Sequence, residues 1–261
     1  MPKSSPCYEL RIAETDDDIR DAQRLRYTVF VEELGADGAN VDHAARLECD
    51  AYDPFCDHLI LYDRNRPAGD QAVGAYRVMR EDQAAAFGNY YTETEFDLTA
   101  LKTSGRKLLE LGRSCVHADY RGGSALSQLW VGLMKYSDAL EIDILFGVAS
   151  FHGTDPDAIA LPLSHLHHSH LAPEELRTRV LPAHFTSADR MPADRIDPRA
   201  AMREMPPLIR AYLRLNGKIG EGAFIDHAFN TVDVCIIVDL HQVPPKQRAT
   251  YEKLALREGR G

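Results

Sequence analysis

Residues 108–130 read LLELGRSCVHADYRGGSALSQLW, and the rest of the chain is organised around this stretch. Apolar residues recur at alternate positions through most of Leu108–Val116, which predicts a β-strand. A glycine-containing turn follows at Tyr120–Ser124, and apolar residues at helical spacing then predict a helix over Ser124–Leu140. A strand that leads into a turn and a helix N-terminus presents backbone N–H groups at one point, where they bind an anion or an oxyanion. An ordinary connection between a strand and a helix gives the same pattern.

The flanking segments predict the fold class. Tyr8–Ala13 alternates as a strand does, and His58–Asp63 and Ala72–Met79 predict two strands of an antiparallel hairpin. Asp143–Ser150 is almost entirely apolar, which is typical of a strand in the middle of a sheet. Strand, helix and strand in this order predict a βαβ unit after an antiparallel meander. The sequence therefore predicts an α/β (α+β) fold with a mixed central sheet flanked by helices.

The remaining segments predict mostly helices. Thr15 and Asp18 have the spacing of a capping box, so we expect a helix that ends near Leu34-Gly35. Residues 81–104 suggest a loop that covers something apolar. Three more helices and one strand are expected: helices over Asp157–His170, Pro207–Leu215 and Pro245–Arg257, and a strand over Val232–Leu240.

Composition limits the classes of protein to which this chain can belong. The chain has 261 residues, of which 44% are hydrophobic, and its net charge of −10 argues against general nucleic-acid binding. No apolar run reaches the ~18 residues of a spanning helix, and the N-terminus has no signal-peptide pattern. Five scattered cysteines without a C-x-x-C pair fit a reducing compartment, so we expect a cytoplasmic protein.

Charge is unevenly distributed along the chain. Leu176–Gly220 carries nine Lys or Arg residues against four Asp or Glu residues. A basic segment on an acidic protein suits an acidic partner or an anionic lipid surface. A solvated face with internal ion pairs is the alternative interpretation.

Several other chemistries lack their motifs. The four histidines of residues 165–170 contain no H-E-x-x-H, and zinc needs three or four ligands in a defined geometry, so we expect no metal. The chain has no G-x-S-x-G elbow, no phosphate-binding P-loop and no dinucleotide fingerprint. Cys115 lies inside a strand pattern, where a buried, inert thiol is expected. Glu48, Asp50 and Asp53 either converge on a cation or belong to a polar loop.

The strand with Glu110, the turn Tyr120-Arg121-Gly122-Gly123 and the helix after it resemble the GNAT acyltransferase superfamily. In that fold the turn holds the pyrophosphate or pantetheine end of the acyl donor. Arg121–Ala125 is a degenerate match to the usual Q/R-x-x-G-x-G/A, which favours a carrier-bound pantetheine over free coenzyme A. The resemblance implies a set of donor-binding residues: Val116, Arg121, Gly122, Gly123 and Ser124.

A narrower resemblance rests on a set of charged residues. The patterns Arg26-x-x-x-Phe30, Glu48-x-Asp50-x-x-Asp53, Arg77 and Glu110-x-x-Arg113 resemble the acyl-homoserine-lactone synthases, GNAT-like enzymes that use acyl carrier protein. The chain is most similar to the lyso-ornithine lipid synthases, and this likeness covers about Tyr8–Leu240. It rests on Ser150–Asp155, Leu163–Pro173, Pro206–Leu215 and Ile225–Asp233, with departures at His152 and at Leu215-Asn216-Gly217.

This resemblance implies one GNAT-like domain over residues 1–261, with a core at about 8–180 and a family-specific extension at about 181–245. Such an enzyme moves a 3-hydroxyacyl chain from acyl carrier protein to the α-amine of L-ornithine and needs no metal or other cofactor. Because the product is a lipid, contact with the inner face of the membrane is also expected. The alternatives are another amine acceptor, an acyl-homoserine-lactone-type synthase that uses S-adenosylmethionine, and a non-catalytic acyl-carrier binding protein.

The resemblance also implies roles for single residues. Glu110 is the candidate acid/base for the amine, and its alternative role is that of a buried ion-pair partner of Arg113 or Arg77. Arg77 or Arg113 suits the substrate carboxylate, and Asp50 or Asp53 suits the ammonium group. Arg26 and Glu48 belong to the same candidate substrate-binding set, and they are also expected to join the N-terminal helix to the sheet.

Overall fold

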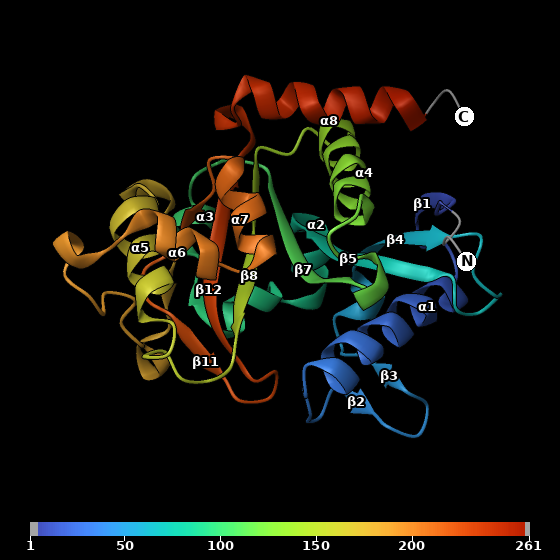
Figure 1. Cartoon of the computed structure of the whole chain (residues 1–261), viewed down its shortest axis with the longest axis horizontal. Coiled ribbons are helices and arrows are strands. Elements are labelled where there is room, and N and C mark those ends of the chain that lie inside the picture. Colours follow the sequence, from blue (N-terminus) through green and yellow to red (C-terminus); the bar gives the residue numbers. More distant parts are fainter. Residues whose placement is uncertain (1–4, 259–261) are drawn as a thin grey trace. The chain divides into compact units, whose positions relative to one another are not determined.

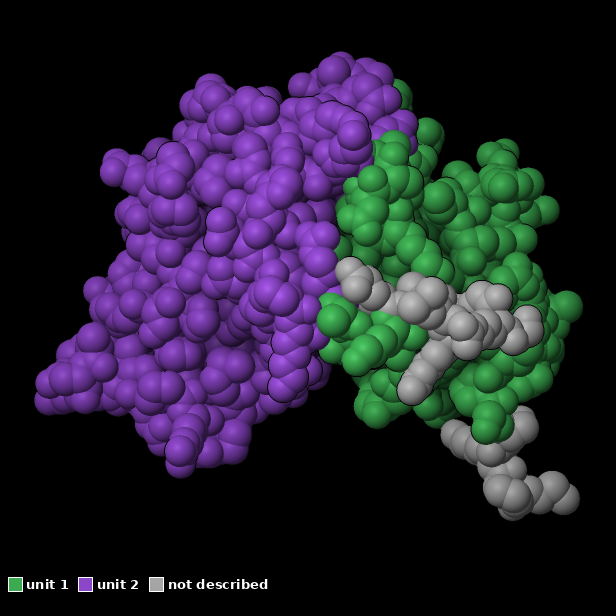
Figure 2. All heavy atoms as spheres, turned by 90° about the horizontal axis from the view of Figure 1, so that it is seen from above, with its two compact units in different colours: residues 1–79, 111–140, 249–261 green, residues 80–110, 141–248 purple. Residues whose placement is uncertain are grey.

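The computed structural model describes residues 5–258 of the chain, which form two compact units. Unit 1 contains the residues up to Met79, Leu111–Leu140 and the residues from Ala249 on (Figure 2). Unit 2 contains Arg80–Glu110 and Glu141–Arg248. Both units are interleaved in sequence, so their boundaries differ from the predicted core at about 8–180 and extension at about 181–245. The single-domain organisation stays a prediction.

Unit 1 is a sheet with a helix on each face (Figure 1). Its strands lie in the order β1-β4-β5-β7, and β1 with β4 and β4 with β5 are antiparallel. The strands are β1 (Tyr8–Ile12), β4 (Asp57–Asp63), β5 (Ala72–Arg80) and the second part of β7 (Leu108–Val116). The helices are α1 (Asp16–Arg26), which continues as a π-helical segment over Tyr27–Glu33, and α4 (Ala125–Ala139). A small hairpin of β2 (Val41–Asp42) and β3 (Leu47–Glu48) precedes β4.

Alternation along β4 decides which helix covers which face of this sheet. Ile60 and Tyr62 belong to a buried cluster with Leu25 of α1, whereas Leu61 lies on the opposite face with Leu129 of α4. Helix α4 also passes very close to β1. A Cβ at Gly132 would come within 1.9 Å of Leu10 Cδ2, so the Leu10 side chain would have to move to admit any other residue.

Local sequence signals fix the two ends of the first helix. Thr15 and Asp18 form the expected capping box, because the Thr15 side chain accepts from the Asp18 N–H and the Asp18 carboxylate accepts from the Thr15 N–H at 3.1 Å. The helical path ends at Gly35, whose φ of 77° lies in the left-handed region. Both predictions for this helix are confirmed.

Unit 2 contains a second group of paired strands. Residues Leu108–Glu110 of β7 pair in parallel with β8 (Ile144–His152), and β8 pairs antiparallel with β12 (Thr231–Asp239). Strand β12 also pairs with β10 (Lys218–Ile219) and β11 (Phe224–Asp226). The parallel β7–β8 pair, with α4 between the two strands in sequence, confirms the predicted βαβ unit.

The helices of unit 2 include three that the sequence did not predict, α2 (Glu81–Phe87), α3 (Thr99–Lys102) and α6 (Pro198–Glu204). Residues 81–104, expected as a loop, contain α2, α3 and the short strand β6 (Phe96–Asp97), which pairs with β9 (Arg179–Val180). The other helices are α5 (Ala160–His170), α7 (Pro207–Arg214) and α8 (Pro245–Glu258), the last of which continues into unit 1.

The mixed sheet with flanking helices confirms the predicted fold class. Helix α5 begins at Ala160 and not at Asp157, where the sequence placed it. Within residues 5–258, no helix combines the length and the apolar character that crossing a membrane requires.

Candidate active site

A ring of buried ion pairs lies in unit 1. The Arg26 guanidinium, at the end of α1, contacts Glu48 Oε2 through Nε at 2.5 Å and Asp53 Oδ2 through Nη2 at 2.7 Å. These three side chains are 1%, 0% and 2% exposed. Arg26 and Glu48 thus join α1 to β3, a strand of the small hairpin and not of the main sheet.

Two further arginines close the ring. Arg77 of β5 contacts Asp53 Oδ1 at 2.8 Å and Asp50 Oδ1 at 2.5 Å. Arg113 of β7 contacts Asp50 Oδ2 at 2.9 Å and Glu48 Oε1 at 3.1 Å. Each carboxylate therefore bridges two guanidinium groups. The cations on which the three acids converge are arginines of the chain itself.

The charges in the ring stabilise one another. Although burial acts to raise it, the Arg26 guanidinium and the Arg77 charge hold the pKa of Asp53 far below its usual range. The pKa of Asp50 is lowered in the same way by Arg77 and Arg113. Arg113 adopts a left-handed φ of 48°, which is strained for a residue with a side chain, and its two ion pairs hold it there.

All six residues of the ring were candidate substrate-binding residues, and each of them has its ion-pair partners within the protein. Arg77, Arg113, Asp50 and Asp53 were expected to hold the carboxylate and ammonium groups of a substrate, and their roles toward substrate remain hypotheses.

Burial shifts the pKa of two further residues near the ring, Cys115 and His58. It raises the pKa of the Cys115 thiol to about 12, which makes it the inert thiol that was expected. Burial also lowers the pKa of His58, whose Nε2 lies 3.0 Å from the Asp53 carbonyl oxygen and donates to it.

Glu110 lies in unit 2 and is held by backbone groups. Its carboxylate is 4% exposed and accepts from the Tyr91 N–H at 3.1 Å and from the Thr92 N–H at 2.6 Å. Glu110 is the register partner of Phe146 on β8, and the Phe146 ring packs edge-on against Tyr90 at 5.0 Å. The negative charge of Glu110 is thus stabilised and fixed in position by a turn that precedes β7.

The turn around Glu110 adds polar groups that the sequence did not reveal. The Tyr90 hydroxyl and the Thr92 hydroxyl are buried and have no hydrogen-bond partner among the described residues. Burial, and after it the charges of Glu81 and Glu110, raise the pKa of Tyr90, so its hydroxyl remains protonated. The signal in the sequence was the two segments Phe87–Tyr91 and Phe96–Leu98, which suggested a covering loop.

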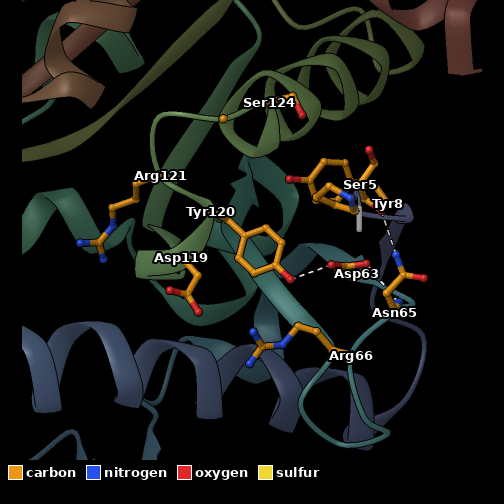
Figure 3. A pocket seen from close by; sticks show the side chains of 11 residues that line it. Ser5, Tyr8, Asp63, Asn65, Arg66, Asp119, Tyr120, Arg121 and Ser124 are labelled. Atoms are coloured by element: carbon orange, nitrogen blue, oxygen red, sulfur yellow. Dashed lines mark hydrogen bonds between the residues drawn. The ribbon is translucent and has the colours of Figure 1, made fainter. Parts of the chain in front are cut away.

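A pocket of about 610 Å³ lies in unit 1 at the N-terminus of α4. Figure 3 shows Tyr120 and Arg66 on one side of this pocket and Ser124, the N-cap residue of α4, on another. Gln128 donates the first intrahelical hydrogen bond to the Ser124 carbonyl at 2.9 Å, so the N–H groups before it belong to the open end of the helix. The pocket is lined by Ser5, Pro6, Tyr8, Asp63, Asn65, Arg66, Asp119, Tyr120, Arg121, Gly123 and Ser124.

Three of the five predicted donor-binding residues line this pocket, and the other two lie close to them in sequence. Arg121, Gly123 and Ser124 line it, and Gly122 supplies the turn with a φ of 76°. Val116 contributes its carbonyl oxygen, which accepts from Arg121 Nε at 3.0 Å. The N–H group directly after Val116 donates to the Val73 carbonyl at 2.9 Å, so the sheet already uses it. The N–H groups of Asp119, Tyr120 and Arg121 also have acceptors within the turn, so a ligand would have to use the N–H groups nearer the start of α4.

The far wall of the pocket comes from residues that the sequence did not single out. The Tyr120 hydroxyl donates to Asp63 Oδ2 at 2.6 Å. Burial acts to raise the pKa of Asp63, but this bond and the backbone N–H bonds of Asn65 and Cys7 lower it. Asp63 ends β4 and Arg66 lies in the hairpin turn, so their approach to Tyr120 depends on the packed sheet.

Comparison with known proteins identifies the family. Residues 25–131 match the acetyltransferase (GNAT) domain family. An L-ornithine N(alpha)-acyltransferase of Rhodobacter capsulatus is 53% identical over 256 residues, which cover 97% of this chain and 97% of that protein. One of Brucella abortus is 41% identical over 247 residues, which cover 93% of this chain and 88% of that protein. The chain belongs to the L-ornithine N(alpha)-acyltransferase family. Both resemblances drawn from the sequence, to the GNAT superfamily and to this family, are confirmed.

Solved structures of more distant proteins share the fold. A coenzyme A-dependent acyl-homoserine lactone synthase superposes with a TM-score of 0.54 at 11% identity, over 95% of this chain and 90% of its own. An N-acyl amino acid synthase from uncultured soil microbes gives 0.50 at 12% identity, over 91% and 93%. The GNAT-like architecture is therefore shared while nearly nine in ten residues differ.

Two groups of side chains among the described residues offer ligand atoms suited to a metal ion. The first consists of Glu95, Asp226 and Asp233, and Glu95 and Asp233 are both 2% exposed. The second consists of His167, His168 and Asp189. In each group the three ligand atoms lie within 4.8 Å of one another.

Proposed function

We propose that this chain transfers an acyl group, carried as a thioester, to the α-amine of L-ornithine. The observation that carries this proposal is 53% identity over 97% of the chain to a protein named as an L-ornithine N(alpha)-acyltransferase. The product is an amide, lyso-ornithine lipid when the acyl group is a 3-hydroxyacyl chain. The reaction takes place in the cytoplasm, and the amphipathic product leaves at the inner face of the membrane.

The donor in this proposal is acyl carrier protein, and its phosphopantetheine occupies the pocket at the N-terminus of α4. The open N–H groups of the helix and Arg121 give that end of the pocket positive character. Arg121 is held in place by the Val116 carbonyl at 3.0 Å and by Glu33 Oε2 at 2.7 Å.

The basic segment Leu176–Gly220 supplies the surface for the acidic carrier in this proposal. Some of its cations are engaged internally, since Arg179 pairs with Glu221 at 3.4 Å and Arg177 Nε donates to the Ala172 carbonyl at 2.8 Å. The Arg179 side chain is still 56% exposed, so this ion pair is weak and open to an outside carboxylate.

The chemistry requires the amine to lose a proton, the oxyanion to be stabilised and the thiolate to leave. In the proposed mechanism Glu110 accepts the proton of the α-amine, directly or through a water, as the nitrogen bonds to the thioester carbon. The open backbone N–H groups at the N-terminus of α4 stabilise the oxyanion. The C–S bond then breaks and the pantetheine thiol takes up a proton. The burial of Glu110 and its two backbone donors support this assignment, because they fix the carboxylate before substrate binds.

The six-residue ring of unit 1 has a scaffolding role in this proposal. It ties the end of α1, the segment around β3, β5 and β7 to one another through buried charges. The strand that carries Glu110 is the same strand that carries Arg113, so the ring holds the chain path on which the chemistry depends.

One assay tests the function as a whole. The purified chain is incubated with 3-hydroxyacyl carrier protein and, separately, with ornithine, lysine or glycine, and the products are identified by mass. N-acylornithine should be the main product. Acylation of another amine instead of ornithine would reassign the acceptor. An arm with S-adenosylmethionine tests the lactone-synthase alternative, and the absence of product from every acceptor would favour a binding protein.

Substitution of Ser124 by aspartate is expected to separate donor binding from stability. A carboxylate at this position should stabilise α4 or leave it unchanged, because its negative charge complements the helix dipole and the Ser124 side chain makes no capping hydrogen bond that would be lost. The same charge repels the phosphate of the donor, so KM for acyl carrier protein should rise about tenfold while KM for ornithine stays constant. Ser124→Asn, a neutral cap, is the matched control. An unchanged donor KM in Ser124→Asp would contradict donor binding at this end of the helix.

A further inference from the structure

The end of α5 holds two separate pairs of histidines. The His165 and His170 rings meet edge-on with centroids 5.3 Å apart, and the His167 and His168 rings meet in the same way at 5.0 Å. The acyl-transfer chemistry uses neither pair. The second pair differs from the first because a carboxylate, Asp189, lies beside it.

We propose that His167, His168 and Asp189 form a zinc-binding site that joins α5 to the segment Ser187–Met191. Their three ligand atoms lie within 4.8 Å of one another. Three such atoms are no more than about 2.8 Å from a common centre, whereas zinc bonds to histidine nitrogen and carboxylate oxygen are about 2.0–2.2 Å long. Side-chain movements well below 1 Å bring all three atoms into bonding distance.

The atoms of the group are suited to accept a metal. The Nδ1 atom of His167 is buried and has no hydrogen-bond partner among the described residues. His168 Nε2 lies 2.9 Å from Asp189 Oδ1 and 3.1 Å from the Met191 carbonyl oxygen. The His168–Asp189 pair is thus already oriented, and zinc would replace the proton that now links the two side chains.

The second segment is anchored to the helix independently of the metal. The Ser164 hydroxyl, on α5 and 0% exposed, accepts from the Arg190 N–H at 3.0 Å and from the Met191 N–H at 2.9 Å. Arg190 Nε also donates to Asp157 Oδ1 at 2.8 Å. Asp189 is therefore held opposite the two histidines before any ion binds, which lowers the entropic cost of forming the site.

The donor atoms select the metal. Two imidazoles and one carboxylate are ligands that zinc prefers, whereas magnesium and calcium prefer oxygen ligands only. The side chains of His168 and Asp189 are 26% and 50% exposed, which leaves a path for the ion and room for water as the fourth ligand. The sequence did not predict this site because Asp189 lies outside the histidine motif and on a different segment.

Zinc binding by the full chain, with any purification tag removed, tests the proposal. Titration of ZnCl₂ followed by calorimetry should give one site per chain. Asp189→Asn, which keeps the size of an exposed side chain, should weaken zinc binding more than about tenfold, and His167→Ala should do the same. His170→Asn changes a histidine of the other pair and should bind zinc as the unchanged protein does.

Two further readouts make the assignment specific. Cobalt(II) should give the visible absorption of a four-coordinate site in the unchanged protein and lose it in Asp189→Asn. Zinc should raise the melting temperature of the unchanged protein and of His170→Asn but not that of Asp189→Asn, since a ligand stabilises only the folded form that binds it. Equal zinc affinity in Asp189→Asn and the unchanged protein would overturn the proposal, and so would an equal loss in His170→Asn.

Discussion

Replacement of Asp53 by asparagine is expected to lower the free energy of unfolding by about 3–5 kcal/mol, because it removes one negative charge from a buried ion-pair network and leaves the arginines in place. Asp53 is 2% exposed and bridges Arg26 and Arg77 at 2.7 and 2.8 Å. Asparagine has nearly the same size, but its amide carries no charge and presents N–H groups to the guanidinium groups. Both arginines would then be buried with too little negative charge around them. Urea denaturation at neutral pH measures the loss.

The matched control is Asp17→Asn, which changes the same atoms on the surface. The Asp17 side chain is 88% exposed and pairs with Arg20 one helical turn away, so its loss should change stability by less than about 0.5 kcal/mol. If Asp53→Asn were as stable as this control, the ring would contribute nothing to the fold and its scaffolding role would have to be abandoned.

The pH dependence of stability gives a second view of the same ring. Burial acts to raise the pKa of Asp53, yet Arg26 and Arg77 lower it well below the value of about 3.9 that aspartate has in an unfolded chain. A group with a lowered pKa in the folded state stabilises the protein above its unfolded pKa and loses this effect as the pH falls. Stability should therefore decline from about pH 5 downward, and the decline should be shallower in Asp53→Asn.

Substitution of Glu110 by glutamine is expected to lower kcat by about 10²–10⁴-fold, the usual contribution of a general base. The glutamine amide oxygen can accept from the Thr92 N–H or the Tyr91 N–H as the carboxylate does, so the fold should survive. Rates with carrier-bound donor and ornithine at neutral pH measure this loss. Circular dichroism confirms that both proteins are folded.

Glu110 either accepts the amine proton or only holds the turn around Tyr91. A nucleophile that is already unprotonated at neutral pH distinguishes these two roles. With hydroxylamine as acceptor, Glu110→Gln should react nearly as fast as the unchanged protein if the carboxylate takes the amine proton. An equal loss with ornithine and with hydroxylamine would show that Glu110 only holds the turn around Tyr91. Glu93→Gln is the control, because Glu93 also accepts a backbone N–H in that turn, from Tyr90 at 2.9 Å, and should retain kcat within about threefold.

Much of the fold was predictable because its signals are local. The capping box of Thr15 and Asp18, the alternation in His58–Asp63 and the apolar run before Ser150 each depend on residues a few positions apart. The strands and helices that they predict all exist, with ends shifted by a few residues. The segment 81–104 was expected as a loop, since its helices α2 and α3 are only 7 and 4 residues long and too short to show a helical period.

The charged residues of the ring could be named from the sequence, but their arrangement could not. Glu48, Asp50 and Asp53 are close in sequence, so their convergence on a cation was a reasonable hypothesis. Their cations, Arg26 and Arg77 among them, are 24 to 27 positions from Asp53 and reach it through the packing of α1 and β5. In the same way, Tyr91 and Thr92 meet Glu110 across 19 and 18 positions.

The sequence by itself determined the fold class and the list of charged residues, because periodicity, capping and motif spacing are properties of neighbouring residues. The family followed from the resemblance of several segments to known proteins. Only the tertiary structure decided which charges satisfy one another. It paired the three acids with three arginines in a closed ring, placed Glu110 on two backbone N–H groups and brought Asp189 to the histidines of α5. Ion pairs and hydrogen bonds act over a few ångströms in space, and the distance between two residues in space follows from packing, not from their separation along the chain.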